Sequence, residues 1–239
     1  NVNVLEDNLN ITSSNENLLG SVSIGQITGK SAVVTVSHND ALGSSSIALN
    51  ETGALNFDNA EGDVNNAFSG NGQLQLTGSN LNLLGDNQNF SGQLSLDKTS
   101  IASAAGNNLG TASLDIDGTL NLTNLNTLNN TVKSGTGTLV IDNVSNTNHV
   151  FNFAQGNVED GFTGTFDLVD TEFDLSGDNT SALTNSTLKV SKDTVVTVGD
   201  GQQAIGGLEF NGGQVNFHNI SGSTVDLVSQ GTIHANILD

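Results

Sequence analysis

The sequence predicts an all-β fold in which short strands wind into the stacked coils of a solenoid, with three strands in each coil. Short apolar runs alternate with polar residues and are bounded by Gly, Asn, Asp or Ser, which is typical of strands with one buried face. The strands recur about every eight residues, so three of them fill a coil of roughly 20 to 25 residues. Proline is absent, as expected where nearly every backbone N–H belongs to a strand ladder.

The clearest strands lie in the middle of the chain, and an upstream segment resembles them. Residues 135–141 read Gly-Thr-Gly-Thr-Leu-Val-Ile, and residues 162–168 read Phe-Thr-Gly-Thr-Phe-Asp-Leu. Their upstream counterparts are residues 72–76 and residues 90–96, the latter reading Phe-Ser-Gly-Gln-Leu-Ser-Leu. These matches indicate an internal repeat.

A third element extends the repeat and sets its length. Residues 183–190 share their apolar spacing with residues 109–116 and 42–49, which gives a period of about 65 to 75 residues. Insertions between the copies favour a solenoid over a β-sandwich, because a solenoid places insertions in loops on one side of its coils. We therefore expect one elongated domain, whose repeat units cover residues 1–66, 67–131, 132–206 and, in part, 207–239.

The strands expected in these units follow from the alternation of apolar and polar residues. The Gly, Asn, Asp and Ser residues between them suit turns, because they tolerate positive φ or hydrogen-bond to nearby backbone. The expected strands cover residues 18–24, 32–36, 47–49, 55–57, 72–76, 90–96, 114–116, 120–122, 135–141, 162–168, 172–175, 188–190, 195–198, 208–210, 215–217, 225–228 and 232–238.

Alternation also assigns side chains to the two faces of each strand. The apolar side chains form inward columns, and those expected to be buried include Leu94, Leu96, Leu139, Ile141, Phe166 and Leu168. Between residues 114 and 123 the even-numbered apolar residues point inward and leave an outward polar row. That row consists of Asp115, Asp117, Thr119, Asn121 and Thr123, and it is a candidate recognition surface.

The composition excludes several classes of protein. The formal net charge is −20, from 25 acidic residues against five lysines that are dispersed along the chain. Nucleic-acid binding needs clustered Lys and Arg, so we exclude it. Cysteine is absent, which excludes disulfides and thiol chemistry. No apolar run approaches the roughly 20 residues of a membrane-spanning helix.

Few residues offer catalytic chemistry. Asp115 and Asp117 resemble the paired carboxylates of β-helical glycosidases, but the chain has no Trp or Tyr to stack on a sugar and no Arg for a lyase. The four histidines accompany no Gly-x-Ser-x-Gly motif, so a serine-protease triad is not expected. We predict no enzyme activity and no cofactor.

The densest group of acidic residues offers the oxygen ligands that calcium prefers. The chain lacks both the EF-hand spacing and the Gly-Gly-x-Gly-x-Asp repeat of calcium-binding β-rolls, so we predict a solvated acidic face and no metal site. Four members of this group, Asp167, Asp170, Glu172 and Asp174, form a second candidate binding surface. The whole group consists of Asp160, Asp167, Asp170, Glu172, Asp174 and Asp178.

Three phrases between residues 20 and 217 carry a family resemblance. They are Gly-x-Gly-x-Leu-x-Ile, Phe-[Ser/Thr]-Gly-x-[Leu/Phe]-x-Leu, and the run Ile-Gly-Gly-Leu-Glu-Phe-Asn-Gly-Gly-Gln-Val-Asn-Phe at 205–217. They resemble the repeats in passenger domains of bacterial type V autotransporters, the group that includes self-associating and host-adhesive surface proteins. The resemblance implies a right-handed parallel β-helix that is displayed outside the cell. It also implies a longer parent protein with an outer-membrane β-barrel anchor that is not in this chain.

The resemblance and the polar rows together predict an adhesin that supports aggregation, biofilm formation or surface attachment. Its expected partner is a copy of itself on a neighbouring cell, or a host matrix protein, cell-surface protein or glycan. Two alternatives stay open. One is a dedicated receptor for a host matrix protein such as fibronectin, with acidic residues providing electrostatic selectivity. The other is a β-helical carbohydrate-active enzyme.

Overall fold

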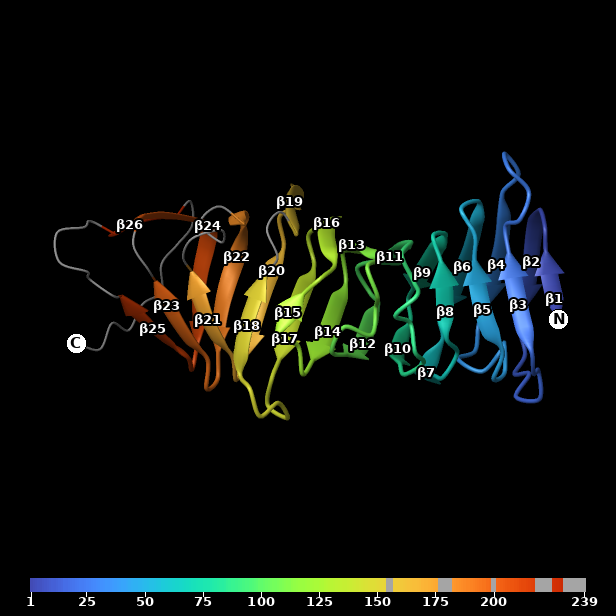
Figure 1. Cartoon of the computed structure of the whole chain (residues 1–239), viewed down its shortest axis with the longest axis horizontal. Helices are drawn as coiled ribbons and strands as arrows, with labels where there is room; N and C mark the ends of the chain where they lie inside the picture. Colours follow the sequence, from blue (N-terminus) through green and yellow to red (C-terminus); the bar gives the residue numbers. More distant parts are fainter. Residues whose placement is uncertain (154–156, 176–181, 199–200, 218–224, 230–239) are drawn as a thin grey trace.

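The computed structural model is a rod of parallel β-strands wound into about ten stacked coils (Figure 1). It describes residues 1–239 except 154–156, 176–181, 199–200, 218–224 and 230–239. The described residues contain no helix. At about 4.8 Å per coil, ten coils give a rod about 50 Å long. The predicted β-solenoid is confirmed, while the strand expected at 232–238 lies outside the described residues.

Four parallel sheets form the sides of the rod. Sheet A contains β1 (Val2–Val4), β3 (Ser21–Ile24), β5 (Ser46–Leu49) and β8 (Phe68–Gly70). Sheet B contains β2 (Asp7–Ile11), β4 (Ala32–Val36), β6 (Gly53–Asp58), β9 (Gln73–Thr77), β11 (Gln93–Leu96), β13 (Ser113–Ile116), β16 (Thr131–Gly135) and β19 (Val158–Phe162). Sheet C contains β7 (Glu61–Val64), β10 (Asn80–Leu83), β12 (Ile101–Ala105), β14 (Thr119–Thr123), β17 (Thr138–Asp142), β20 (Thr165–Val169), β22 (Leu183–Ser191), β24 (Gly201–Asn211) and β26 (Val225–Ser229). Sheet D contains β15 (Thr127–Leu128), β18 (Val150–Phe153), β21 (Glu172–Leu175), β23 (Val195–Val198) and β25 (Gln214–Phe217).

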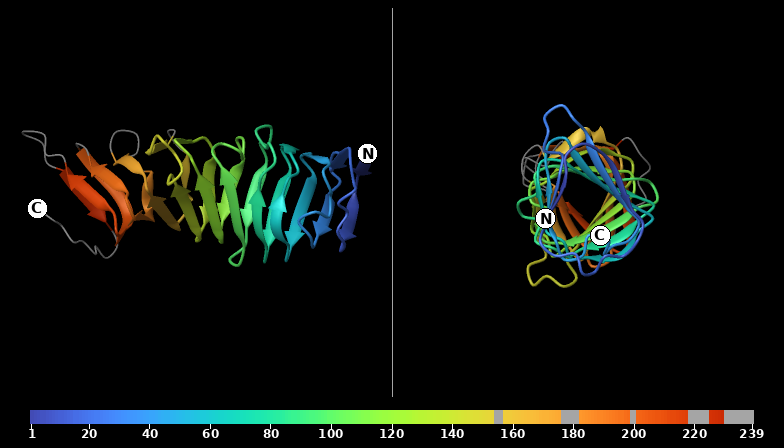
Figure 2. Two further views of the ribbon diagram at one scale, coloured as in Figure 1. Left: turned by 90° about the horizontal axis from the view of Figure 1, so that it is seen from below. Right: turned by 90° about the vertical axis from the view of Figure 1, so that its right-hand side faces the viewer.

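The order of these strands gives each coil three sides. In the N-terminal half the chain passes through sheets A, B and C in turn, as in β5, β6 and β7. Further along the chain it passes through sheets B, C and D, as in β16, β17 and β18, and after β21 the described strands alternate between sheets C and D. The strands β15 and β18 of sheet D, like those of sheet A, are each followed by a strand of sheet B, so sheets A and D occupy the same side. The view along the rod shows the resulting closed outline (Figure 2).

The interior is filled by in-register columns of apolar side chains. In sheet B, for example, Leu55, Leu74, Leu94 and Leu114 are paired from strand to strand, and each is at most 1% exposed. Stacked parallel strands impose this arrangement, because the same face of every strand points inward. All six side chains that the sequence assigned to the core are buried: Leu94, Leu96, Leu139, Ile141, Phe166 and Leu168.

The Phe-x-Gly motif forms a tight corner between strands. Phe90 and Phe162 are buried under their corners. A Cβ at Gly92 would lie 1.8 Å from the carbonyl oxygen of Gly72 and 2.8 Å from the Phe90 ring. A Cβ at Gly164 would lie 2.1 Å from a carbonyl oxygen of the preceding coil and 2.7 Å from the Phe162 ring. Glycine is therefore required at these corners, because a carbonyl oxygen of the preceding coil and the buried Phe ring both lie close to the backbone.

Asparagine side chains connect the turns of successive coils. The Nδ2 of Asn130 donates to the carbonyl oxygen of Ala112 at 2.9 Å, and that of Asn157 donates to Asn130 O at 2.9 Å. These bonds satisfy carbonyl groups at turns, where the strand ladders end. Asparagines with this kind of inter-coil bond, spaced one or two coils apart, include Asn66, Asn108, Asn130 and Asn157.

The repeated segments of the sequence do not occupy equivalent positions. Residues 72–76 belong mainly to β9 in sheet B, whereas their counterpart at 135–141 leads into β17 in sheet C. Likewise, Gly92 precedes a strand of sheet B and Gly164 precedes a strand of sheet C. Every corner of the coil has the same steric requirements, so similar phrases arise on different sides. The single coil is the structural repeat, and the four longer units stay a prediction.

We expect Leu139→Asp to destabilise the protein by about 4 kcal/mol or more, because it places an unpaired carboxylate in a fully buried column. Thr138→Ala, one residue away on the outward side, is the control and should change the free energy of unfolding by less than about 1 kcal/mol. Urea denaturation followed by far-UV circular dichroism measures both. Equal losses in the two variants would contradict the assignment of inward and outward faces.

Asp97 joins two coils at the corner between sheets B and C. Its Oδ1 accepts hydrogen bonds from Ser100 Oγ at 2.7 Å, from the backbone N–H of Gly78 at 3.2 Å and from that of Thr99 at 3.1 Å. Partial burial raises the pKa of Asp97, but these hydrogen bonds together lower it more, so the pKa lies below its ordinary value. The ionised form is therefore favoured by folding.

The lowered pKa of Asp97 predicts a pH dependence of stability. A carboxyl group whose pKa is lower in the folded state stabilises the protein above its unfolded pKa of about 4, and this contribution is lost as the pH falls through the folded value. Asp97→Asn should be less stable than the wild type at neutral pH, and the gap should narrow as the pH drops below about 4. Urea denaturation midpoints across a pH series measure the difference in stability between the two proteins. A difference that stays constant into strong acid would show that the charge of Asp97 contributes nothing to stability.

Candidate functional site

The outward row predicted between residues 115 and 123 lies on two sides of the rod. Asp115 belongs to β13 in sheet B, Asp117 lies in the turn that follows, and Thr119, Asn121 and Thr123 belong to β14 in sheet C. All five side chains point outward and are half-buried, as the alternation predicts. The row turns a corner at Gly118, so its members face two sides of the rod. Its role as a recognition surface stays a prediction.

The two acids of that row are occupied by bonds to the next coil. Ser134 Oγ donates to Asp115 Oδ1 at 2.7 Å. Thr136 donates to Asp117 Oδ1 through both its backbone N–H and its Oγ1, each at 3.0 Å. Hydrogen bonds to an ionised carboxylate are stronger than neutral ones. Asp115 and Asp117 therefore hold one coil to the next, and a role as paired catalytic carboxylates has no support in these contacts.

The second predicted surface is also divided. Asp167, expected to be solvated, is only 8% exposed on β20, because Lys189 and Ser191 of the adjacent strand cover it. Lys189 Nζ lies 2.8 Å from Asp167 Oδ2, and Ser191 Oγ donates to Asp167 Oδ1. The carboxylate is thus paired and hydrogen-bonded within sheet C, which corrects its assignment to an open binding surface.

The remaining members of the second surface lie beyond the corner that follows β20. Asp170 is in the turn, has a positive φ of 48°, and has its Oδ1 3.3 Å from His149 Nδ1. Glu172 and Asp174 are exposed on β21 and line a shallow groove of sheet D with Asn152 and Thr197. Asp178 lies outside the described residues. Of the described members of the second surface, Glu172 and Asp174 keep the exposed position that the sequence predicted, and Asp160 of the wider acidic group is exposed on β19.

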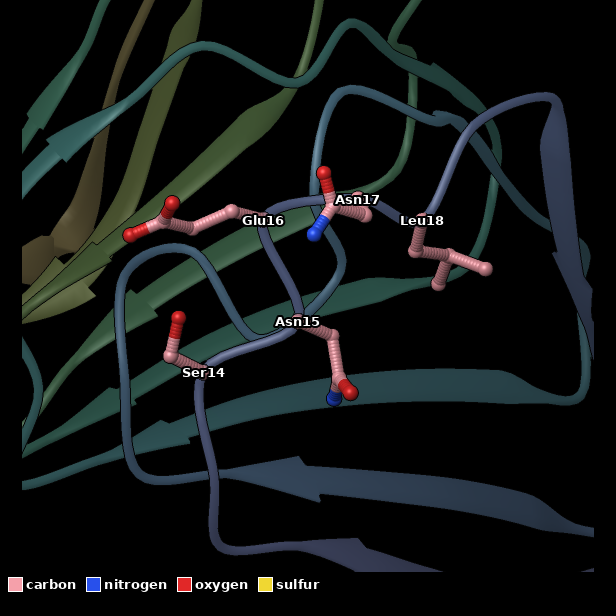
Figure 3. A pocket seen from close by; sticks show the side chains of 5 residues that line it. All are labelled: Ser14, Asn15, Glu16, Asn17 and Leu18. Atoms are coloured by element: carbon pink, nitrogen blue, oxygen red, sulfur yellow. The ribbon is translucent and has the colours of Figure 1, made fainter.

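A second concave surface lies near the N-terminal end of the rod and is shown in Figure 3. It is lined by the turn from Ser14 to Leu18, which packs against the following coil. Ser14 Oγ donates to Asp40 Oδ2 at 2.7 Å, and Asn15 Nδ2 donates to Ala41 O at 3.1 Å. The side chains of Glu16 and Leu18 point in different directions (Figure 3). With no convergent set of polar groups, the surface lacks the arrangement of a small-molecule site.

A further regular surface, on sheet B, is one that the sequence did not single out. Most outward side chains of six successive strands of sheet B, from β2 to β13, form two parallel columns that we call the neutral face, and the charged Asp58 of β6 lies outward just beyond the second column. Asp115, at the C-terminal end of one column, is its only charged member, in a chain whose net charge is −20. The first column is Asn8, Val33, Ala54, Gln73, Gln93 and Ser113, and the second is Asn10, Thr35, Asn56, Gln75, Ser95 and Asp115.

The neutral face is dominated by amides and hydroxyls, which both donate and accept hydrogen bonds. Neighbouring amides already interact, since Gln75 Nε2 donates to Gln73 Oε1 at 2.8 Å. The outward side of sheet C differs, because it carries Glu61 and Asp63 on β7 and Glu209 on β24. Repulsion between two copies of the chain is therefore smaller where neutral faces meet than where the outward sides of sheet C meet.

The described residues contain neither a metal-binding group of side chains nor a membrane-spanning helix. Among the described residues, no three His, Asp or Glu side chains are grouped so that they could hold a metal ion. That same part of the chain contains no helix long and apolar enough to cross a membrane.

Comparison with known proteins gives two relatives from Escherichia coli K12. The chain is 39% identical to the uncharacterized protein YuaQ over 152 residues, which cover 62% of this chain and 11% of YuaQ. It is 36% identical to the uncharacterized lipoprotein YdeK over 104 residues, which cover 44% of this chain and 8% of YdeK. The matched segments thus span about a tenth of either relative. No family model matches the chain. No solved structure matches it either.

Proposed function

We propose that this chain is a self-associating adhesin segment of a bacterial cell-envelope protein, and that copies on neighbouring cells bind through their neutral faces. The observation that supports this proposal is the neutral face itself. It is a flat, nearly uncharged area on a strongly acidic molecule, and its amides and hydroxyls are complementary to those of a second copy. Two rods related by a twofold axis would bring donors opposite acceptors along the columns.

The size of the neutral face indicates a weak contact in a single chain. Six strands about 4.8 Å apart, with two outward residues each, give an area of roughly 25 Å by 15 Å, or about 400 Å² per copy. Stable interfaces bury about 800 Å² per partner. A weak contact is suited to an adhesin, because many copies on two opposed cells multiply the avidity without strong individual bonds.

The cellular location in this proposal is the envelope. The relative YdeK is a lipoprotein by name, and the sequence resembles passenger domains of surface-displayed autotransporters. We propose that the chain is displayed at the outer surface as part of a longer protein. The host-matrix receptor stays the second candidate, because the exposed residues Glu172 and Asp174 on sheet D offer a separate acidic surface.

We expect the triple variant Gln73→Glu, Gln75→Glu and Gln93→Glu to abolish self-association, because it places three like charges on each of the two facing surfaces at nearly unchanged shape. The matched control is Gln26→Glu, Gln88→Glu and Gln214→Glu, which adds the same charge at three exposed positions away from the neutral face. Sedimentation velocity over a concentration series and settling of cells that display each variant measure the effect. Thermal denaturation verifies that both variants fold.

The possible results separate the candidate functions. Loss of settling in the first variant only supports the proposal. Equal settling of the wild type and both variants would rule out the neutral face as the contact. Cells that never settle, yet attach to a matrix-coated surface and lose that attachment when Glu172 and Asp174 are changed to Gln and Asn, would favour the receptor instead.

A further inference from the structure

The chain contains two Asn-Gly steps, Asn71-Gly72 and Asn211-Gly212. In such a step the backbone nitrogen of glycine can attack the side-chain Cγ of asparagine, because glycine has no Cβ to hinder the approach. A new N–Cγ bond forms, the Cγ–Nδ2 bond breaks, and ammonia leaves a five-membered succinimide. Water then opens the ring to give aspartate or isoaspartate. The reaction therefore needs only water, but it requires a backbone that can rotate.

The fold blocks this reaction at Asn71-Gly72. Gly72 is buried between β8 and β9, and its N–H donates to the carbonyl oxygen of Leu49 at 2.9 Å. The space around it is closed, since a Cβ built on Gly72 would lie 2.3 Å from Asn50 O and 2.5 Å from Gly53 O. The attacking nitrogen is held in the inter-coil ladder and cannot turn toward the Asn71 side chain without breaking it.

The other dipeptide, Asn211-Gly212, lies in open surroundings. Asn211 ends β24, Gly212 follows in the turn toward β25, and both residues are exposed. Gly212 has a φ of 94°, and the atom nearest to a Cβ built there is Lys192 Cα at 3.6 Å. Gly212 makes one isolated antiparallel bridge, to Ser191, at the end of its strand, but it has open space around it, which the walled-in Gly72 lacks.

We propose that Asn211 is a site of spontaneous deamidation, and that Asn71 is protected by the fold although it has the same local sequence. The product places a carboxylate, or an extra backbone methylene in the isoaspartyl form, opposite Ser191, which pairs with Asn211 across β22 and β24. Ser191 is also the residue that donates to the buried carboxylate of Asp167. Modification of Asn211 thus adds charge and disturbs the register beside this ion-paired cluster.

Incubation of the purified full chain at mildly alkaline pH, followed by peptide mapping with mass spectrometry, tests the proposal. The peptide with Asn211 should gain the mass of an amide-to-acid conversion and become a substrate for isoaspartyl methyltransferase. The peptide with Asn71 should react at least an order of magnitude more slowly in the folded protein. In urea, both peptides should react at similar rates, which controls for local sequence.

Two variants complete the design. Asn211→Gln should remove the reactive signal from its peptide, and Asn71→Gln should leave the folded-state reaction unchanged. Equal rates at the two steps in the folded chain would overturn the proposal. So would a folded-state rate at Asn211 as slow as that at Asn71 when both react in urea.

Discussion

Every coil of the rod must keep its backbone in hydrogen-bonding distance of the coil before it on all three sides. The strands satisfy this requirement by the parallel ladder itself, but the corners need other means, because there the chain changes direction while the stacking continues. Gly92 and Gly164 allow backbone to approach backbone at corners, and asparagines such as Asn130 donate to carbonyls that the ladder leaves open. The composition of the chain, rich in Gly and Asn and free of Pro, follows from this requirement.

The same requirement explains how much of the fold could be predicted from the sequence. Alternation correctly assigned Leu114, Ile116, Leu120 and Leu122 to the interior. It also separated a strand at 114–116 from one at 120–122, which correspond to β13 and β14. It could not show that the two strands lie on different sides of the rod, because Gly118 is also buried and continues the period of two through the bend. Whether a side chain points inward or outward depends on the local alternation of residues. The side of the rod on which its strand lies depends on the positions of the corners.

The candidate surfaces were harder to predict for the same reason. The neutral face exists only across strands, since Gln73 and Gln93 become neighbours through the register of β9 and β11. No local motif marks such a surface, although a scan for charge at outward positions spaced by one coil would have detected it. The pairing of Asp167 with Lys189 likewise joins residues from adjacent coils, so the density of acids along the chain overstated how many of them are solvated.

The abundance of amide side chains has two distinct consequences in this fold. Asn130 and Asn157 are used within the rod, because their amides satisfy the carbonyls of a neighbouring turn. Asn8 and Asn10 lie on outward positions of sheet B, where the ladder already satisfies the backbone. Only amides of this second kind can exchange water for a partner molecule at low cost, since removing the first kind leaves buried carbonyls unpaired. The capacity for recognition therefore depends on which amides the corners leave unused, and on sheet B these form continuous columns with almost no charge.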